Sequence, residues 1–144
     1  MLQACGNVGE TLWTQRSLAE IAMDRSDTAE ARKRFVASLD AYREDTHPVL
    51  ALLSLGGLAA IAAARGEPDK AARLIGATEV LFESSGALLA VGDQAEYRQR
   101  VALIRRQLDE DVYEDGRAAG RAMSLADAVA LACDGCSGDD LRGF

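Results

Sequence analysis

One pattern occurs twice in the sequence: LAEIAMDRSDTAEARKRF at residues 18–35 and LAAIAAARGEPDKAARLI at residues 58–75. Each copy has a Leu-Ala pair and a further alanine, then a break at Ser26 or Gly66, then another alanine and a bulky apolar residue. Every landmark recurs 40 residues later. Small residues let paired helices approach closely, and the bulky residue fills the gap between neighbouring helices. The pattern therefore predicts repeated helix–turn–helix units and an all-α fold.

The rest of the chain also has helical periodicity. Apolar residues make up 49% of the 144 residues, and no segment alternates in the way typical of strands. We expect seven helices, at about 8–25, 27–43, 49–65, 68–83, 93–108 and 110–122, with a short seventh from 124. A loop of small and apolar residues, 87–92, precedes the fifth. One helical domain should cover residues 1–133, and residues 134–144 should form a flexible acidic and glycine-rich tail.

Local signals indicate which residues of these helices turn inward. The expected inward stripes are Leu12, Leu18, Ile21 and Ala22 in the first helix, Ala31, Phe35, Leu39 and Tyr42 in the second, and Tyr97, Val101, Ile104 and Leu108 in the fifth. The third helix is apolar nearly all round, which predicts a central, buried position. Capping boxes are expected at Asp27 and at Ser124. Close helix packing explains glycines inside the expected helices, which are Gly56, Gly57, Gly116 and Gly120.

The repeat resembles the tetratricopeptide family, which places a Leu-Gly pair in its first helix and Ala and Phe in its second. Ala19 and Ala59 stand where that family prefers glycine, and the period is 40 residues in place of about 34. The resemblance implies a tetratricopeptide-like α–α superhelix of three helix pairs and a short closing helix. It also implies a concave groove, lined by the first helix of each pair, that binds a protein or peptide.

Three stretches resemble the C-terminal helical region of large bacterial regulators: GEPDKAARLIGATE from Gly66, AEYR from Ala95 and GRAMSLADAVALA from Gly120. These LuxR-type or SARP-type regulators carry a signal-transducing NTPase domain ahead of the repeats, often with a DNA-binding or cyclase domain. The resemblance implies a sensor or scaffold arm that docks against adjacent domains of the same regulator. The first expected helix begins almost at Met1, which suggests excision from a longer protein.

Charge and composition exclude several classes of partner. The net charge is −7 and the pI about 4.7, whereas domains that bind nucleic acid usually have a basic surface. No apolar stretch reaches the roughly 20 residues of a membrane span, and the N-terminus lacks the pattern of a signal peptide. Three cysteines do not make a disulfide framework. We therefore expect a cytoplasmic protein that binds neither nucleic acid nor membrane.

The residues best known for catalysis do not converge in this sequence. Cys133 and Cys136 form a CxxC motif. A redox CxxC opens a helix, whereas this one is expected to close a helix. A zinc site usually has two such pairs or added histidines, and the sequence has only Cys5 and His47 besides this motif. His47 lies beside a proline with no nucleophile or orienting partner in view, so a turn is its expected role. We expect incidental thiols, no metal or cofactor, and no enzymatic activity.

The candidate partner-binding residues lie on the first and fifth helices. They are Trp13, Gln15, Arg16, Arg98 and Arg105. Trp and Arg are common interface anchors. Two alternatives stay open: Trp13 packs in the core, and the arginines belong to a solvated face with local ion pairs to acidic residues such as Glu96 and Asp109.

Two further hypotheses concern the whole domain. A short repeat array exposes apolar end faces, so it could form a homodimer. The very apolar third helix could instead border a cavity, together with the last helices, that senses a small apolar ligand.

Overall fold

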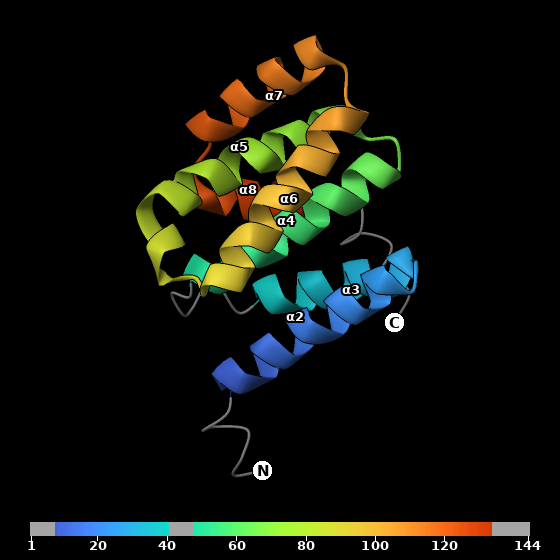
Figure 1. Ribbon diagram of the computed structural model, residues 1–144, viewed down its shortest axis with the longest axis vertical. Coiled ribbons are helices and arrows are strands. Elements are labelled where there is room, and N and C mark those ends of the chain that lie inside the picture. The colour runs from blue at the N-terminus through green and yellow to red at the C-terminus, as the bar shows by residue number, and fades with distance from the viewer. Residues whose placement is uncertain (1–7, 41–47, 134–144) are drawn as a thin grey trace.

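The computed structural model describes residues 8–40 and 48–133, and over these ranges the protein is all-helical (Figure 1). Seven α-helices and one 3-10 helix follow one another, and these residues contain no strand. The elements are α2 (Val8–Asp24), α3 (Thr28–Asp40), α4 (Pro48–Ala64), α5 (Pro68–Ser85), η1 (Gly86–Leu88), α6 (Val91–Gln107), α7 (Glu110–Ala122) and α8 (Leu125–Cys133). The predicted all-α class is confirmed.

Within the described residues the helix boundaries follow the sequence prediction to within two residues, and the main difference is at residues 87–92; the expected end of the second helix, at about 43, lies outside the described residues. Part of this expected loop is the 3-10 turn η1, and α6 begins two residues early, at Val91. The side-chain amide of Gln94 donates to the carbonyls of Gly86 and Leu89, which closes the turn. Leu89 is buried against α4 and α6. The segment is therefore ordered by packing, a long-range effect that local composition does not indicate.

The two copies of the repeat form the same turn. Ser26 and Gly66 both have a left-handed backbone, with φ of 62° and 77°. Asp27 donates its backbone N–H to Ala22 (2.8 Å), and 40 residues on Glu67 donates to Ala62 (2.9 Å). These bonds close the C-terminal ends of α2 and α4 in a Schellman-type motif. The repeat read from the sequence is thus present in the backbone hydrogen bonds.

Both expected N-caps are also formed. The carboxylate of Asp27 accepts the N–H of Glu30 at 3.3 Å, and the hydroxyl of Ser124 accepts the N–H of Asp127 at 3.0 Å. Each bond satisfies a donor that the first turn of a helix would otherwise leave unpaired. Short-range sequence signals therefore locate the starts of α3 and α8 correctly.

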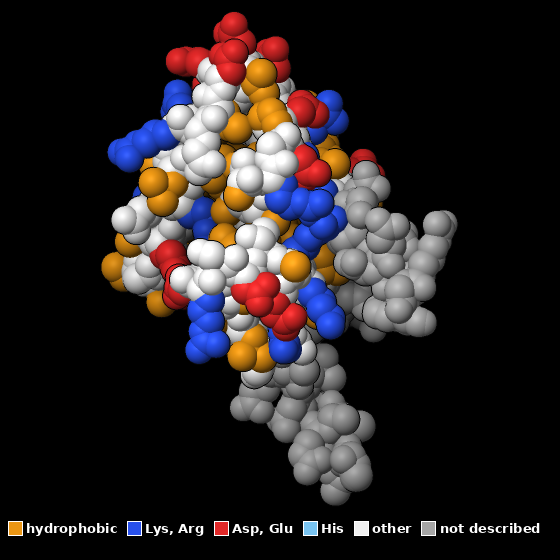
Figure 2. Space-filling model, turned by 90° about the vertical axis from the view of Figure 1, so that its right-hand side faces the viewer, with side chains coloured by type: hydrophobic (Ala, Val, Ile, Leu, Met, Phe, Trp, Pro, Cys, Tyr) orange, Lys and Arg blue, Asp and Glu red, His pale blue; other side chains and the backbone are white. Residues whose placement is uncertain are grey.

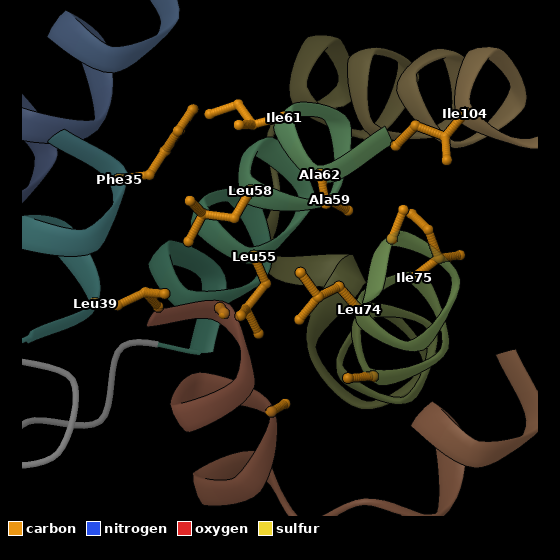
Figure 3. Close-up of a cluster of buried hydrophobic side chains, with 14 of the residues drawn as sticks. Phe35, Leu39, Leu55, Leu58, Ala59, Ile61, Ala62, Leu74, Ile75 and Ile104 are labelled. Carbon is orange, nitrogen blue, oxygen red and sulfur yellow. The ribbon is translucent and has the colours of Figure 1, made fainter. Parts of the chain in front are cut away.

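Helix α4 lies at the centre of the molecule, as its all-round apolar sequence predicts. It packs against α3, α5 and α6, and more lightly against α2 and α8. Its buried side chains meet those of α3, α5 and α6 in one cluster (Figure 3). In α3 the stripe Ala31, Phe35 and Leu39 is fully buried, as expected, whereas Tyr42 lies outside the described residues.

The expected third helix pair does not form in the way the first two do. Helix α7 packs mainly against α5, while α6 crosses α4 (Figure 1). The α5–α7 contact is close because glycines line it. A Cβ at Gly120 would lie 1.9 Å from the carbonyl oxygen of Arg73, and one at Gly76 would lie 2.1 Å from that of Arg117. Close helix packing, predicted for Gly116 and Gly120, is confirmed.

The prediction for α2 is partly wrong. Ala19 and Ala22 are buried, but Leu18 and Ile21, expected to face inward, are 37% and 47% exposed. Helix α2 rests on α3 and α4 through its small residues, which leaves its opposite face open. The side chain of Leu12 lies outside the described set.

Candidate partner-binding groove

A hollow of about 370 Å³ lies between α2, α4 and α6. These are the first helices of the two repeated pairs and the helix that follows them. The lining residues are Met23, Asp24, Ala60, Glu96, Gln99, Arg100, Leu103, Ile104 and Gln107. We call this hollow the groove. Most of its lining comes from α6, which crosses α4 instead of pairing with α7.

The lining of the groove combines apolar and polar side chains. Ile104 is buried, whereas its neighbour Leu103 is 51% exposed. The exposed side chains of Gln99, Gln107 and Asp24 belong to the same lining. An exposed leucine among hydrogen-bonding side chains is a common setting for a bound peptide, since apolar burial gives affinity and polar groups orient the ligand.

A cluster of ion pairs fixes α6 against α2 at the wall of the groove. Arg100 donates from both terminal nitrogens to the two carboxylate oxygens of Glu20, at 2.7 and 3.1 Å. Arg16 approaches Glu20 at 3.3 Å and Glu96 at 3.6 Å. The side chains of Arg16, Arg100 and Glu20 are only 11%, 16% and 18% exposed. Their charges therefore largely neutralise one another, and the cluster holds the wall in place.

The candidate residues of the first helix are spread over its faces. Trp13 is half-buried and packs against the cluster of Leu52, Leu53, Leu89 and Tyr97. Gln15 accepts a hydrogen bond from Arg34 of α3 at 3.1 Å. Arg16 alone reaches the groove, through its ion pair with Glu96.

The two candidate arginines of the fifth helix lie elsewhere. The guanidinium of Arg98 is 5.2 Å from the centroid of the Phe82 ring, beside a second hollow of about 260 Å³ between α5 and α6. That of Arg105 is 5.1 Å from the ring of Tyr113 in α7. Arg98, Arg100 and Arg105 of α6 thus each contact a side chain of another helix. In Figure 2 basic side chains lie scattered among acidic and apolar ones, and acidic side chains gather at the top, where α7 lies.

Sequence reasoning missed Met23, Gln99, Leu103 and Gln107 as groove residues. One signal was available for Leu103. It is apolar but lies off the inward stripe of α6, which runs through Tyr97, Val101 and Ile104. A large apolar residue beside such a stripe widens the apolar face and indicates either a further contact or an exposed patch.

The sequence also left open a cavity between α4 and the last helices. A hollow there, lined by Ile61, Ala62 and Ala132 among others, holds about 10 Å³. That is roughly the space of a single water-sized probe. Small-molecule sites usually measure about 300–1,000 Å³. This hollow is therefore too small for an apolar effector.

A polar contact inside the bundle joins α5 to α6. The Thr78 hydroxyl donates to the carbonyl of Ile75 at 2.7 Å, so its oxygen is left to accept the Tyr97 hydroxyl at 2.9 Å. The Tyr97 ring stacks on Phe82 with centroids 4.8 Å apart. Burial raises the pKa of Tyr97 to about 12. Nearby, Glu79 accepts from Arg117 and Arg121 of α7, and the hydrogen bond raises the pKa of Arg117.

Of the cysteines and the histidine considered for catalysis, only Cys133 lies among the described residues. Cys133 ends α8 and is half-buried against the main core. Cys5, Cys136 and His47 lie outside the described residues. Over 8–40 and 48–133, no three His, Cys, Asp or Glu side chains gather in a way that could hold a metal ion. Nor does any helix in these ranges combine the length and apolar composition needed to cross a membrane.

Comparisons of the chain with protein-family models, with curated proteins and with solved structures found no match. The resemblance to tetratricopeptide repeats and to bacterial regulators therefore stays a prediction from the sequence.

Proposed function

We propose that this protein is a tetratricopeptide-like interaction module that binds a segment of a partner protein in the groove. The observation that carries the proposal is the groove itself, about 370 Å³ between α2, α4 and α6, with the exposed Leu103 in its lining. The helices and the Arg100–Glu20 pair pre-order its walls. A pre-ordered surface loses little conformational entropy when a partner binds.

The lining favours a particular kind of partner segment. Leu103 and Ile104 offer a site for one apolar side chain, and Gln99 and Gln107 can hydrogen-bond to peptide groups. The ion pairs of Arg16 and Arg100 balance the charges of Glu20 and Glu96, so the acidic charge left in the lining is that of Asp24. An apolar anchor flanked by lysine or arginine is therefore the best match in charge.

The module would serve as the repeat arm of a bacterial transcriptional or signalling regulator in the cytoplasm. The support for this wider role is the sequence resemblance between Gly66 and Ala132. An adjacent domain of the same regulator would then be one source of the bound segment. No catalytic step is part of the proposal, since the groove lining contains neither a His nor a Cys, Ser or Lys that could act as a nucleophile.

Binding by matched variants tests the proposal. The chain and its Leu103→Lys and Val91→Lys variants are immobilised and used to capture proteins from cells that naturally produce it. Val91 is 82% exposed and does not line the groove. We expect one protein to be retained by the parent and by Val91→Lys and lost with Leu103→Lys. Equal capture by all three would reject the groove as the site, and a co-purified small molecule in native mass spectra would favour a sensor.

A further inference from the structure

The second hollow, of about 260 Å³, lies between α5 and α6 and is separate from the groove. Helix α6 packs on α4 and only lightly on α5, which leaves this space open. The lining consists of Glu79, Phe82, Glu83, Tyr97, Arg98 and Val101, and none of these residues lines the groove. Helix α6 therefore borders two independent candidate sites.

An aromatic pair forms much of the apolar lining of the second hollow. The rings of Phe82 and Tyr97 stack with their centroids 4.8 Å apart. Tyr97 is buried, and the hydrogen bond of its hydroxyl with Thr78, at 2.9 Å, holds the ring in place. Phe82 and Val101 are half-buried, so a ligand with an apolar group can cover the part of their surface that is still exposed.

Arg98 supplies a guanidinium that is positioned but not neutralised. It lies 5.2 Å from the centroid of the Phe82 ring, a cation–π contact that favours this position. Within residues 8–40 and 48–133 no carboxylate pairs with Arg98, whereas Arg100 in the same helix is paired with a glutamate. A guanidinium in this state can donate to both oxygens of an incoming carboxylate.

The two glutamates of the hollow are already paired with arginines of α7. Glu79 accepts from Arg117 at 2.7 Å and from Arg121 at 3.0 Å, and Glu83 lies 2.8 Å from Arg121. The charges of these four residues balance, so the charge left at the hollow is the positive charge of Arg98. The glutamates still repel a ligand that carries a second negative charge, which favours a monoanion over a dianion.

We propose that the second hollow binds a small organic acid with one carboxylate and one aromatic ring. The carboxylate pairs with Arg98, and the ring lies against Phe82 and Val101. A cavity of about 150 Å³ admits benzene, whereas sites for drug-sized ligands measure about 300–1,000 Å³. The 260 Å³ of this hollow therefore suit an acid about as large as phenylacetate. The proposal does not depend on a partner in the groove, because the two sites share no residue.

Titration calorimetry of the full chain with phenylacetate tests the proposal. We expect saturable binding at one site per chain, with a Kd of about 1 mM or tighter. Uncharged phenylacetamide should bind about tenfold more weakly, because it lacks the charge that pairs with Arg98. Doubly charged benzylphosphonate should also bind more weakly than phenylacetate, because Glu79 and Glu83 repel it.

Two substitutions of exposed side chains should change the affinity for phenylacetate in opposite directions. Arg98→Gln should weaken binding about tenfold or more, because a charge-assisted pair is lost. Glu83→Gln should strengthen binding about two- to threefold, because a negative charge beside the hollow is removed. Arg106→Gln is the matched control and should leave the affinity unchanged, since Arg106 is an exposed arginine of α6 outside the lining.

Four results would overturn the proposal. Phenylacetate could fail to bind the parent chain. Arg98→Gln and Arg106→Gln could weaken binding equally, which would indicate a general effect of charge. Benzylamine could bind more tightly than phenylacetate and lose affinity with Glu83→Gln, which would make the hollow a cation site. A Gly-Gly-Phe peptide could bind more tightly than phenylacetate, which would assign the hollow to the C-terminus of a polypeptide.

Discussion

At the scale of single residues, the two repeat turns have a different residue at the position whose backbone is left-handed. Ser26 has φ of 62° and Gly66 has φ of 77°. A left-handed conformation disfavours residues with a Cβ by about 1 kcal/mol and suits glycine. A Cβ at Gly66 would meet no atom within 4 Å, so backbone conformation alone decides the effect there.

Exchanging these residues should shift stability in opposite directions. Ser26→Gly should raise the free energy of unfolding by about 0.5–1 kcal/mol, and Gly66→Ser should lower it by a similar amount. Urea denaturation of both variants and of the parent measures this. A change of the same sign in both variants would contradict the equivalence of the two turns.

Gly120 makes a stronger demand, because the space that a Cβ needs is filled by backbone. Gly120→Ala should force α7 away from Arg73 and cost about 2–3 kcal/mol of unfolding free energy. Gly92→Ala is the matched control. Gly92 is in the first turn of α6, and a Cβ added there would meet no atom within 4 Å. Calorimetry that finds the two variants equally stable would show that α5 and α7 pack less closely than described.

Tyr97 should make stability fall at alkaline pH. Its pKa is raised by burial from 10.0 to about 12, so the folded chain holds this proton more tightly than the unfolded chain does. The stability is fully present below pH 10 and is lost as pH rises toward 12, by about 2–3 kcal/mol in total.

Denaturation at a series of pH values tests this, with Tyr97→Phe as the comparison. The variant should lose about 1 kcal/mol at neutral pH, from the bond to Thr78, and should be less sensitive between pH 10 and 12. An equally steep loss in parent and variant would assign the titration to other groups.

Residue-level patterns were informative where the cause is local. The caps at Asp27 and Ser124 and the turn at Gly66 depend on neighbours within five residues, and the sequence predicts them. The exposure of Leu18 and Ile21 depends on which helices surround α2, and no local pattern contains that information. Helical periodicity alone placed Leu18 and Ile21 on the inward stripe with Ala22.

At the scale of elements, the sequence does not determine which helix packs against which. Gly116 and Gly120 indicate that α7 makes a close contact, but they do not identify α5 as its partner. The counterpart, Gly76, lies about 40 residues earlier and was not singled out. Because α7 pairs with α5, α6 is left to cross α4 and to form the groove.

The position of α6 should depend on its ion pair with α2. A double-mutant cycle with Glu20→Gln and Arg100→Gln should give a coupling energy of about 1–2 kcal/mol, because the pair is bidentate and mostly buried. The control pair, Arg105 and Glu114, is 3.6 Å apart with side chains 57% and 45% exposed. Its coupling should stay below about 0.5 kcal/mol. Equal coupling in the two cycles would mean that Arg100 does not hold α6.

At the scale of the whole molecule, the repeat predicts the first two helix pairs, and the all-round apolar sequence of α4 predicts its central place. The tetratricopeptide resemblance implied a groove lined by the first helix of each pair, and α2, α4 and α6 do border this one, but the repeat does not predict that most of the lining comes from α6. Of the five residues chosen from the sequence, only Arg16 reaches the groove, and it does so through Glu96. The choice followed residue type, whereas the site depends on how α6 crosses α4.

The central claim is that this groove binds a partner protein, and site-specific photo-crosslinking in cells tests it most directly. A photoreactive residue is placed at 99 or 103, which line the groove, or at 80 or 91, which are exposed elsewhere. We expect the same protein to be crosslinked from 99 and 103 and not from 80 or 91. Crosslinks from 80 or 91 with none from the groove would contradict the claim.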